Sequence, residues 1–252
     1  MKHFFKAGST PTSIESSQIL QTDRLLPLGP DMLISECSTH RTRRALVPRK
    51  DRVYRMQKAV FDVSIAGTAL LFLMPLFLAI AVMIKLTSRG PVMFRQDRYG
   101  LNGELFRIYK FRTMATDACD ADGVIQTVKD DPRVTTIGRI LRSTSFDELP
   151  QLINILKREM SIVGPRPHVP GMLANGVLYE EFDPRYTERH QVLPGLTGLA
   201  QVKGYRGETK TERAARMRLN YDLEYIRRQS IMLDVHITIH TFWREFFRGS
   251  GY

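Results

Sequence analysis

Residues 63–84 read VSIAGTALLFLMPLFLAIAVMI, a run of 22 residues without a charge. A helix needs about 20 apolar residues to cross a bilayer, and a core helix of a soluble protein is seldom apolar on every face. The run begins too far from the N-terminus for a signal peptide and lacks a small-residue cleavage site. We therefore predict a membrane helix over residues 59–86.

Pro75 lies close to the middle of this helix and is expected to kink it. Both flanks are basic, with a cluster of Lys and Arg over residues 41–58 and further cations from Lys85 onward. Basic flanks favour the cytoplasmic side of a membrane. A re-entrant helix that bends at Pro75 keeps both flanks inside, whereas a straight crossing also tolerates a proline. The pattern leaves both topologies open.

The remaining chain divides into a tail and a folded domain. Residues 1–58 are rich in Ser, Thr and Pro and are predicted to be a basic, disordered cytoplasmic tail. Its basic end is typical either of a solvated segment or of one that binds anionic membrane lipids. Residues 87–252 are predicted to form the soluble, folded part of the chain. The net charge of +11 suggests an anionic partner, namely nucleic acid, a membrane or a phosphorylated substrate.

The domain mixes short strands with helices. The runs PVMFRQ and LFRIYKF are β-like, whereas residues 149–160 and 209–228 have helical spacing. Residues 230–249 are expected to be a helix with an apolar stripe. The stripe fits either a core helix or an interfacial helix with aromatic anchors, and its members are Ile231, Val235, Ile239, Phe242 and Phe246.

Residues 143–152, STSFDELPQL, place two carboxylates side by side. Ser145 and Glu148 fit a capping box, and Pro150 suits a first turn, so we predict a helix that begins around Asp147. A helix N-terminus also attracts phosphate. Two adjacent carboxylates there can bind a divalent metal, and one of them can attack phosphorus as a nucleophile. Capping and catalysis are both open interpretations at this point.

Candidate phosphate ligands surround this pair in the sequence. Lys110 and Arg112 share a face of a strand-like run, because alternate residues of a strand point the same way. Arg142 precedes the acidic pair, and Arg166 lies between two prolines that restrict its backbone. Any one of them fits a surface charge, but their grouping favours a phosphate site.

Other chemistries have little support. Cys37 and Cys119 are too few for a zinc site or a disulfide framework. His236 and His240 lack the glutamate of a helical zinc motif, and the chain contains no Walker A run and no dinucleotide-binding fingerprint.

Three runs, over residues 61–114, 131–167 and 193–205, resemble the bacterial sugar transferases, which are monotopic phosphoglycosyl transferases acting on polyprenyl phosphate. The resemblance covers about residues 54–252. It implies an α+β, mostly helical fold. A re-entrant helix broken at Pro75 would join a cytoplasmic catalytic domain that has interfacial amphipathic helices and a small β element.

The resemblance also implies an enzyme of the bacterial inner membrane, acting at its cytoplasmic face. Asp147 would attack the β-phosphorus of a UDP-hexose and expel UMP, and undecaprenyl phosphate would then take the sugar phosphate from the enzyme. Mg²⁺ is expected beside Asp147 and Glu148. By the same resemblance, contacts to phosphate or nucleotide are assigned to Lys110, Arg112, Arg142 and Arg166.

Residues 204–226, GYRGETKTERAARMRLNYDLEYI, are similar to the branch that transfers glucose 1-phosphate and begins exopolysaccharide synthesis. Galactose or another UDP-sugar is the alternative donor. Two competing classes are a membrane-anchored nucleic-acid-binding protein and a structural protein of a polysaccharide assembly complex. We expect no nucleic-acid partner, and the sequence leaves homo-oligomerisation open.

Overall fold

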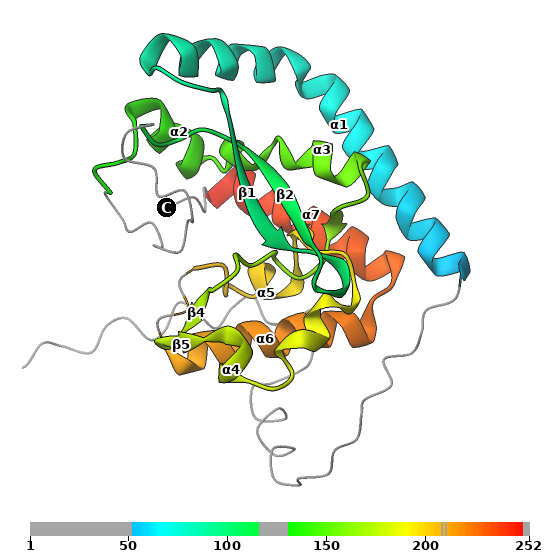
Figure 1. Cartoon of the computed structure of the whole chain (residues 1–252). Helices are drawn as coiled ribbons and strands as arrows, with labels where there is room; N and C mark the ends of the chain where they lie inside the picture. The colour runs from blue at the N-terminus through cyan, green and yellow to red at the C-terminus, as the bar shows by residue number, and fades with distance from the viewer. Residues whose placement is uncertain (1–51, 116–130, 208, 210, 249–252) are drawn as a thin grey trace, which may run out of the picture. The chain divides into compact units, whose positions relative to one another are not determined.

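The computed structural model describes residues 52–115, 131–207, 209 and 211–248 (Figure 1). The α-helices are α1 (Arg52–Thr87), α2 (Thr136–Ser143), α3 (Gln151–Leu156), α4 (Tyr179–Phe182), α5 (Leu199–Val202), α6 (Glu212–Arg228) and α7 (Ile231–Arg248). The 3₁₀ turns are η3 (Leu101–Gly103), η5 (Phe146–Glu148) and η6 (Tyr186–Gln191). The strands are β1 (Met93–Tyr99), β2 (Leu105–Phe111), β3 (Ser161–Val163), β4 (Leu173–Ala174), β5 (Val177–Leu178) and β6 (Gly195–Thr197). The fold is mostly helical with a few small strands.

Helix α1 runs without interruption through Pro75 and bends along its length (Figure 1). A proline removes one backbone hydrogen bond, which accounts for a bend inside a continuous helix. Residues 52–58, which were predicted to belong to the tail, are already helical, and the rest of that predicted tail lies outside the described residues. Among the described residues, α1 is the one helix long and apolar enough to cross a membrane.

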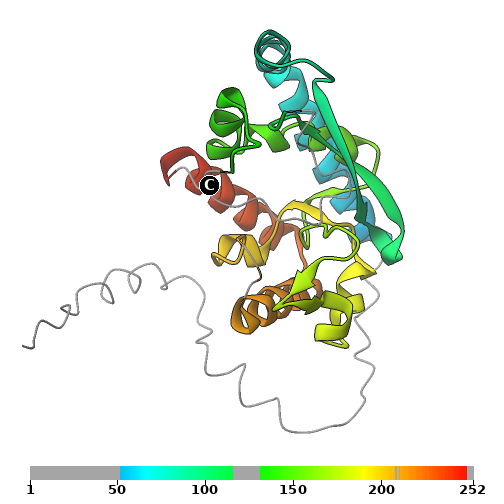
Figure 2. The same ribbon diagram turned by 60° about the vertical axis from the view of Figure 1, so that its left-hand side comes forward.

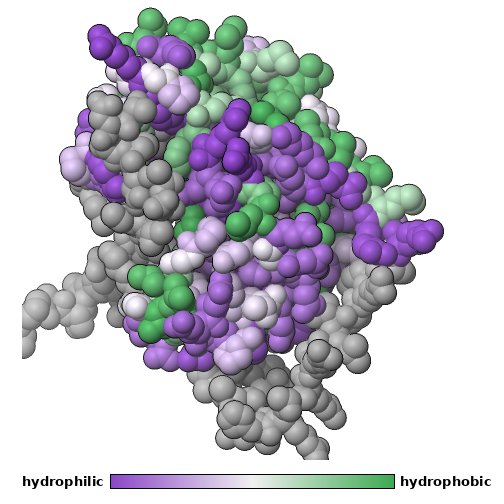
Figure 3. All heavy atoms as spheres, viewed as in Figure 1, coloured by the Kyte–Doolittle hydropathy of each residue, from purple (hydrophilic) through white to green (hydrophobic). Residues whose placement is uncertain are grey.

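Most of the apolar surface of α1 is not used for packing. Leu71, Phe72, Leu78 and Leu86 are each at least two-thirds exposed. Hydrophobic residues gather along the upper edge of the molecule, over α1, whereas much of the remaining face is hydrophilic (Figure 3). An exposed apolar strip of this kind marks a surface that contacts a membrane or another protein.

The N-terminal half of α1 rests on the domain. Ala66 is fully buried, and a Cβ on Gly67 would lie 3.9 Å from the side chain of Leu156 in α3, so small residues allow the two helices to approach closely. Lys58 forms ion pairs with Asp62 at 3.3 Å and with Asp234 of α7 at 2.9 Å. Apolar packing and buried charges together attach this half of α1 to the core.

Strands β1 and β2 form the antiparallel hairpin expected from the two β-like runs. The register pairs Met93 with Phe111 at one end and Tyr99 with Leu105 at the other. Asn102 and Gly103 turn the chain with φ angles of 54° and 79°, a conformation that Asn and Gly adopt more easily than other residues. The hairpin carries Lys110 near the end of β2.

Strands β3 and β6 pair in parallel and bring two glycine-containing loops together. A Cβ on Gly164 would overlap the carbonyl oxygen of Leu193, and one on Gly195 would overlap the backbone of Gly164. Only glycine permits such a close approach of two backbones. The GPRP run is therefore pressed against the PGLTG run, which fixes the place of Arg166.

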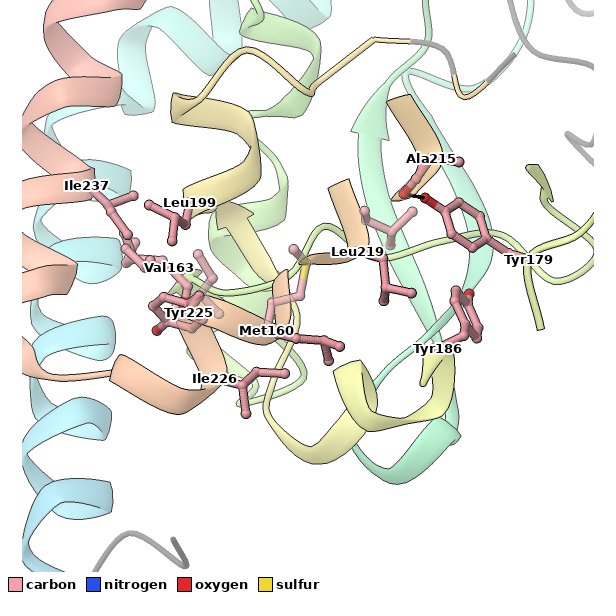
Figure 4. Packing of buried hydrophobic residues seen from close by; sticks show 14 of the residues in the cluster. Met160, Val163, Tyr179, Tyr186, Leu199, Ala215, Leu219, Tyr225, Ile226 and Ile237 are labelled. Atoms are coloured by element: carbon pink, nitrogen blue, oxygen red, sulfur yellow. Dashed lines mark hydrogen bonds between the residues drawn. The ribbon is translucent and has the colours of Figure 1, made fainter. Parts of the chain in front are cut away.

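The main core lies between α6, α7, β3 and the N-terminal half of α1 (Figure 4). Leu219, Leu223 and Ile226 are buried, as their helical spacing predicted. The buried tyrosines satisfy their hydroxyl groups within the core, since Tyr225 donates to the carbonyl of Val163 at 3.0 Å and Tyr179 donates to that of Ala215 at 2.7 Å (Figure 4). Burial with satisfied hydroxyls makes these rings strong packing elements.

Helix α7 leaves part of its predicted apolar stripe exposed. Ile239 and Phe242 are 62% and 68% exposed, whereas Asp234 and Ile237 on the other side are buried. For Ile239 and Phe242 the core interpretation is wrong, because the side of α7 that packs in the core carries Ile237 and Leu233. Figures 1 and 2 both show the C-terminal part of α7 lying beside α2.

Candidate active site

Asp147 and Glu148 lie in the short 3₁₀ turn η5, and α3 begins only at Gln151, with Pro150 directly before it. The helix predicted to begin around Asp147 therefore begins later. The predicted capping box is also wrong, since the side chain of Ser145 makes no capping hydrogen bond. The physical reason is that the side chain of Glu148 is drawn to lysine and arginine side chains instead of to the Ser145 backbone.

Glu148 is the acceptor of a cluster of cations. Lys110 donates to Oε1 at 2.9 Å, and Arg166 donates to both carboxylate oxygens, to Oε2 at 3.1 Å. Arg206 lies 3.6 Å from Oε2. Burial raises the pKa of Glu148, but Arg166, Lys110 and Arg206 outweigh it and hold the pKa well below its ordinary value. Glu148 is thus a fixed negative charge that gathers three cations.

Asp147 lies in a different environment although it is the next residue. Its side chain is partly exposed, and its carboxylate makes no hydrogen bond to any residue that the structure describes. Burial raises the pKa of Asp147, and the charge of Glu148 adds to this against the opposing charges of Lys110 and Arg142. One carboxylate of the pair is therefore committed to cations, and the other is available to a ligand.

The predicted cations do not all reach this cluster. Lys110 and Arg166 contact Glu148 directly. Arg142 donates from Nε to Thr113 Oγ1 at 2.9 Å, and its charge acts on Asp147. Arg112 follows the last residue of β2 and turns to the end of α1, where it donates to the carbonyl of Ser88 at 2.9 Å and to that of Arg89. Arg112 therefore holds Ser88 and Arg89, which directly follow α1, in place.

Two cations at the site were missed by the sequence reasoning. Arg206 follows α5 and lies near Glu148, as described above. Arg98 on β1 donates to the carbonyl of Pro167 at 3.2 Å, and burial together with the charge of Arg166 lowers the pKa of Arg98 to about 10. Neither residue has a local sequence pattern that separates it from a surface arginine. The fold alone brings each of them close to the adjacent carboxylates Asp147 and Glu148, which we call the dyad.

Arg166 is held through its main chain as well as through its side chain. The carbonyl of Arg166 accepts a hydrogen bond from Arg189 at 2.7 Å, and Arg189 is in turn paired with Asp222 at 2.8 Å. Both members of this ion pair are almost fully buried. The GPRP loop is thus supported by glycine contacts on one side and by a buried ion pair on the other.

The cations around the dyad outnumber its two carboxylates, because Lys110, Arg98, Arg142, Arg166 and Arg206 all act on them. Mutual repulsion of this kind favours the binding of an anion with several oxygens, such as a diphosphate. A family model described as bacterial sugar transferase matches residues 53–248. The chain belongs to the bacterial sugar transferase family. Members of this family are enzymes, and this sugar transferase has its dyad and cations in one cluster.

Three relatives show where the similarity lies. The chain is 51% identical over 195 residues to the exopolysaccharide production protein PSS of Rhizobium leguminosarum bv. phaseoli, covering 77% of this chain and 98% of that protein. It is 49% identical over 197 residues to an undecaprenyl-phosphate glucose phosphotransferase of Komagataeibacter xylinus, covering 78% of this chain and 37% of that protein. It is 46% identical over 195 residues to a UDP-glucose:undecaprenyl-phosphate glucose-1-phosphate transferase of Klebsiella pneumoniae, covering 77% and 41%. This sugar transferase thus spans nearly all of the first relative and less than half of the other two.

Mg²⁺ binds hard oxygen ligands and is commonly held by one or two carboxylates together with substrate phosphates. The Asp147 carboxylate fits this requirement, since it is partly exposed and no described residue donates to it. Glu148 would have to release a cation before it could share a metal. In the described parts of the chain, no group of three or more His, Cys, Asp or Glu residues gathers as a closed metal cage, and His236 and His240 lie with ring centroids 6.5 Å apart on α7.

Proposed function

We propose that this sugar transferase moves glucose 1-phosphate from UDP-glucose to undecaprenyl phosphate, releasing UMP and forming a sugar-diphospho-lipid, as the first membrane step of exopolysaccharide synthesis. The observation that carries the proposal is the difference in contacts between the two carboxylates of the dyad. Glu148 is held by Lys110 and Arg166, whereas the adjacent Asp147 has no hydrogen bond to a described residue. The names of the relatives support the substrate class.

In the first half of the reaction, a carboxylate oxygen of Asp147 forms a bond to the β-phosphorus of the UDP-sugar. The bond between that phosphorus and the bridging oxygen breaks, and the electron pair leaves with UMP. The raised pKa of Asp147 reflects a carboxylate that is poorly stabilised before substrate arrives, which favours nucleophilic attack. The product on the enzyme is a sugar phosphate joined to Asp147.

In the second half, an oxygen of undecaprenyl phosphate attacks the same phosphorus, and the bond to Asp147 breaks. The carboxylate returns to its starting state, and the lipid carries the sugar through a diphosphate. Lys110, Arg142, Arg166 and Arg206 lie where they can offset the negative charge that the phosphates bring. Glu148 orients these cations and does not itself meet the phosphorus.

Mg²⁺ would be held by Asp147 and by oxygens of the substrate, and when bound it would neutralise charge on the diphosphate and ease the departure of UMP. Glu148 would share the metal only after Lys110 or Arg166 had moved away from its carboxylate. The donor sugar is proposed to be glucose, with galactose or another UDP-sugar as the alternative.

We also propose that α1 enters the bacterial inner membrane, bends at Pro75 and returns, so that the dyad meets its lipid substrate at the cytoplasmic face. The continuous apolar helix and its exposed surface support membrane insertion. Anionic lipids would attract the basic segment before α1. Single cysteines introduced before residue 52 and on α6 should both be labelled only from the cytoplasm. Labelling of the first position from the periplasm would mean that α1 crosses the bilayer.

The function is tested by incubating the purified protein with Mg²⁺, undecaprenyl phosphate and a panel of UDP-sugars while UMP is measured. UDP-glucose should give the highest rate, and chelation of the metal should stop the reaction. If only UDP-galactose released UMP, the donor would be UDP-galactose and not UDP-glucose. The failure of every UDP-hexose to yield UMP would overturn the proposed activity.

A further inference from the structure

Helix α7 has two faces that differ in chemistry. Its outward face carries Met232, Ile239, Phe242 and Trp243, all of them exposed. The opposite face is polar near its C-terminal end and contacts the catalytic domain. Arg244 on that face donates to the carbonyl of Gln201 at 2.9 Å, so it grips the end of α5 just before the loop that carries Arg206.

Glu245 is the next residue and completes a closed set of polar contacts. Its Oε1 accepts from Arg206 at 2.6 Å, and its Oε2 accepts from the hydroxyl of Ser145 at 3.0 Å. Arg206 donates in addition to the Ser145 hydroxyl oxygen at 3.0 Å. The three side chains of Ser145, Arg206 and Glu245 therefore form a triangle in which every member contacts the other two.

Ser145 is the member that links the triangle to the dyad. Its φ angle is 58°, in the left-handed region, and it is followed at once by the turn that carries Asp147 and Glu148. This conformation is strained for a residue with a Cβ, and it persists only where surrounding contacts hold it. The two hydrogen bonds of the Ser145 side chain supply that restraint.

Arg206 links the triangle to the dyad a second time, through its 3.6 Å contact with Oε2 of Glu148. Its guanidinium is thus shared between Glu245 and Glu148. Loss of the Glu245 charge would free Arg206 to move away from its present place. Loss of that charge would therefore weaken the restraint on Ser145 and also the contact between Arg206 and Glu148.

We propose that Glu245 is a positioning residue of the active site, which fixes Arg206 beside Glu148 and holds Ser145 in the conformation that sets the direction of the Asp147–Glu148 turn. As to its consequence for catalysis, this inference rests on the proposed function. Glu245 does not touch the reacting atoms. It acts through Arg206 and Ser145, and it makes α7 a part of the catalytic site.

The test compares Glu245→Gln with Glu212→Gln, a matched control in which an exposed glutamate on α6 loses its charge beside an arginine. In E245Q, kcat for UMP release should fall by about tenfold to a hundredfold, because small displacements of reacting groups are costly, while the KM for UDP-glucose does not rise. The control should keep both constants. Glu245→Asp should recover part of kcat.

A second measurement does not depend on turnover. Hydrogen–deuterium exchange at the amides of residues 145–149 should speed up in E245Q and in Ser145→Ala. The double variant should exchange no faster than either single variant, because both break the same restraint. Exchange over α6 should not change.

The outcomes separate the two proposals. Wild-type protein without UMP release would sink the proposed function, and the exchange experiment would still decide the role of Glu245. Wild-type kcat in E245Q, or unchanged exchange over residues 145–149, would overturn the positioning role. Faster exchange through the whole domain would also overturn it, because Glu245 would then support the fold in general.

Discussion

Lys110 Nζ lies 2.9 Å from Glu148 Oε1, although 38 residues separate the two in the chain. Burial lowers the pKa of Lys110, and the charges of Glu148 and Asp147 act in the opposite direction. Each of the two charges therefore offsets the energetic cost of burying the other. Their contact ties the β1–β2 hairpin to the dyad turn, and the consequences of breaking it can be measured.

Glu148→Gln should destabilise the protein by about 3–5 kcal/mol, because removal of one member of a buried ion pair leaves the other uncompensated. The pKa of Glu148 is lowered in the folded state, so its contribution is present above the ordinary value of 4.5 and is lost as pH falls toward the folded pKa. Denaturant unfolding in detergent at several pH values checks this. A gap between wild type and E148Q that stays constant from neutral pH to below pH 4 would contradict it, and Glu212→Gln provides the control.

Asp147→Asn should behave in the opposite way. Its pKa is raised in the folded state, so the charged form costs stability at neutral pH, and asparagine should leave the melting temperature unchanged or higher. The rate of UMP release should fall by at least about a thousandfold, as expected for a nucleophile. Thermal melting and the UMP assay on one preparation measure both effects. A variant that loses activity only because it melts earlier would argue against the nucleophile assignment.

Arg112→Lys and Arg166→Lys distinguish two arginines that the sequence treated alike. Arg112 holds the end of α1 through the Ser88 carbonyl and hydroxyl, so R112K should lower the melting temperature and leave the KM for UDP-glucose unchanged. R166K should raise that KM, because a lysine cannot reproduce the two-pronged contact with Glu148 that holds the Arg166 side chain in the site. A raised KM in R112K without a change in melting would return Arg112 to the substrate site.

Asp222→Asn tests the buried ion pair that holds the main chain of Arg166 in place. The Arg189–Asp222 pair is almost fully buried, and its disruption should cost about 3–5 kcal/mol in unfolding free energy. Denaturant titration gives this value directly. A loss below about 1 kcal/mol would mean that the pair is as weak as a surface ion pair.

Local sequence patterns were sufficient for several elements. The β1–β2 hairpin followed from two β-like runs, and the buried stripe of α6 followed from helical spacing, because both depend on residues close in the chain. The acidic pair and Arg166 could also be selected, since unusual neighbours set them apart: an adjacent carboxylate in one case, and two prolines in the other.

The remaining features depend on contacts between distant residues. The alternation of a strand placed Arg112 with Lys110, but β2 ends at Phe111, and beyond that point the side chain follows the α1 terminus. The capping box at Ser145 failed because distant cations compete for Glu148. Nothing in the neighbourhood of Arg206 or Glu245 reveals that the two will meet.

The triangle of Ser145, Arg206 and Glu245 also has a consequence for how the protein is made. Its members leave the ribosome at different times, Ser145 first and Glu245 last, and all three follow α1. Under the proposed topology, α1 can enter the membrane while the chain is still being translated, because early elements fold before late ones. A nascent chain would then be anchored before its dyad is held in place, so membrane delivery precedes the onset of activity.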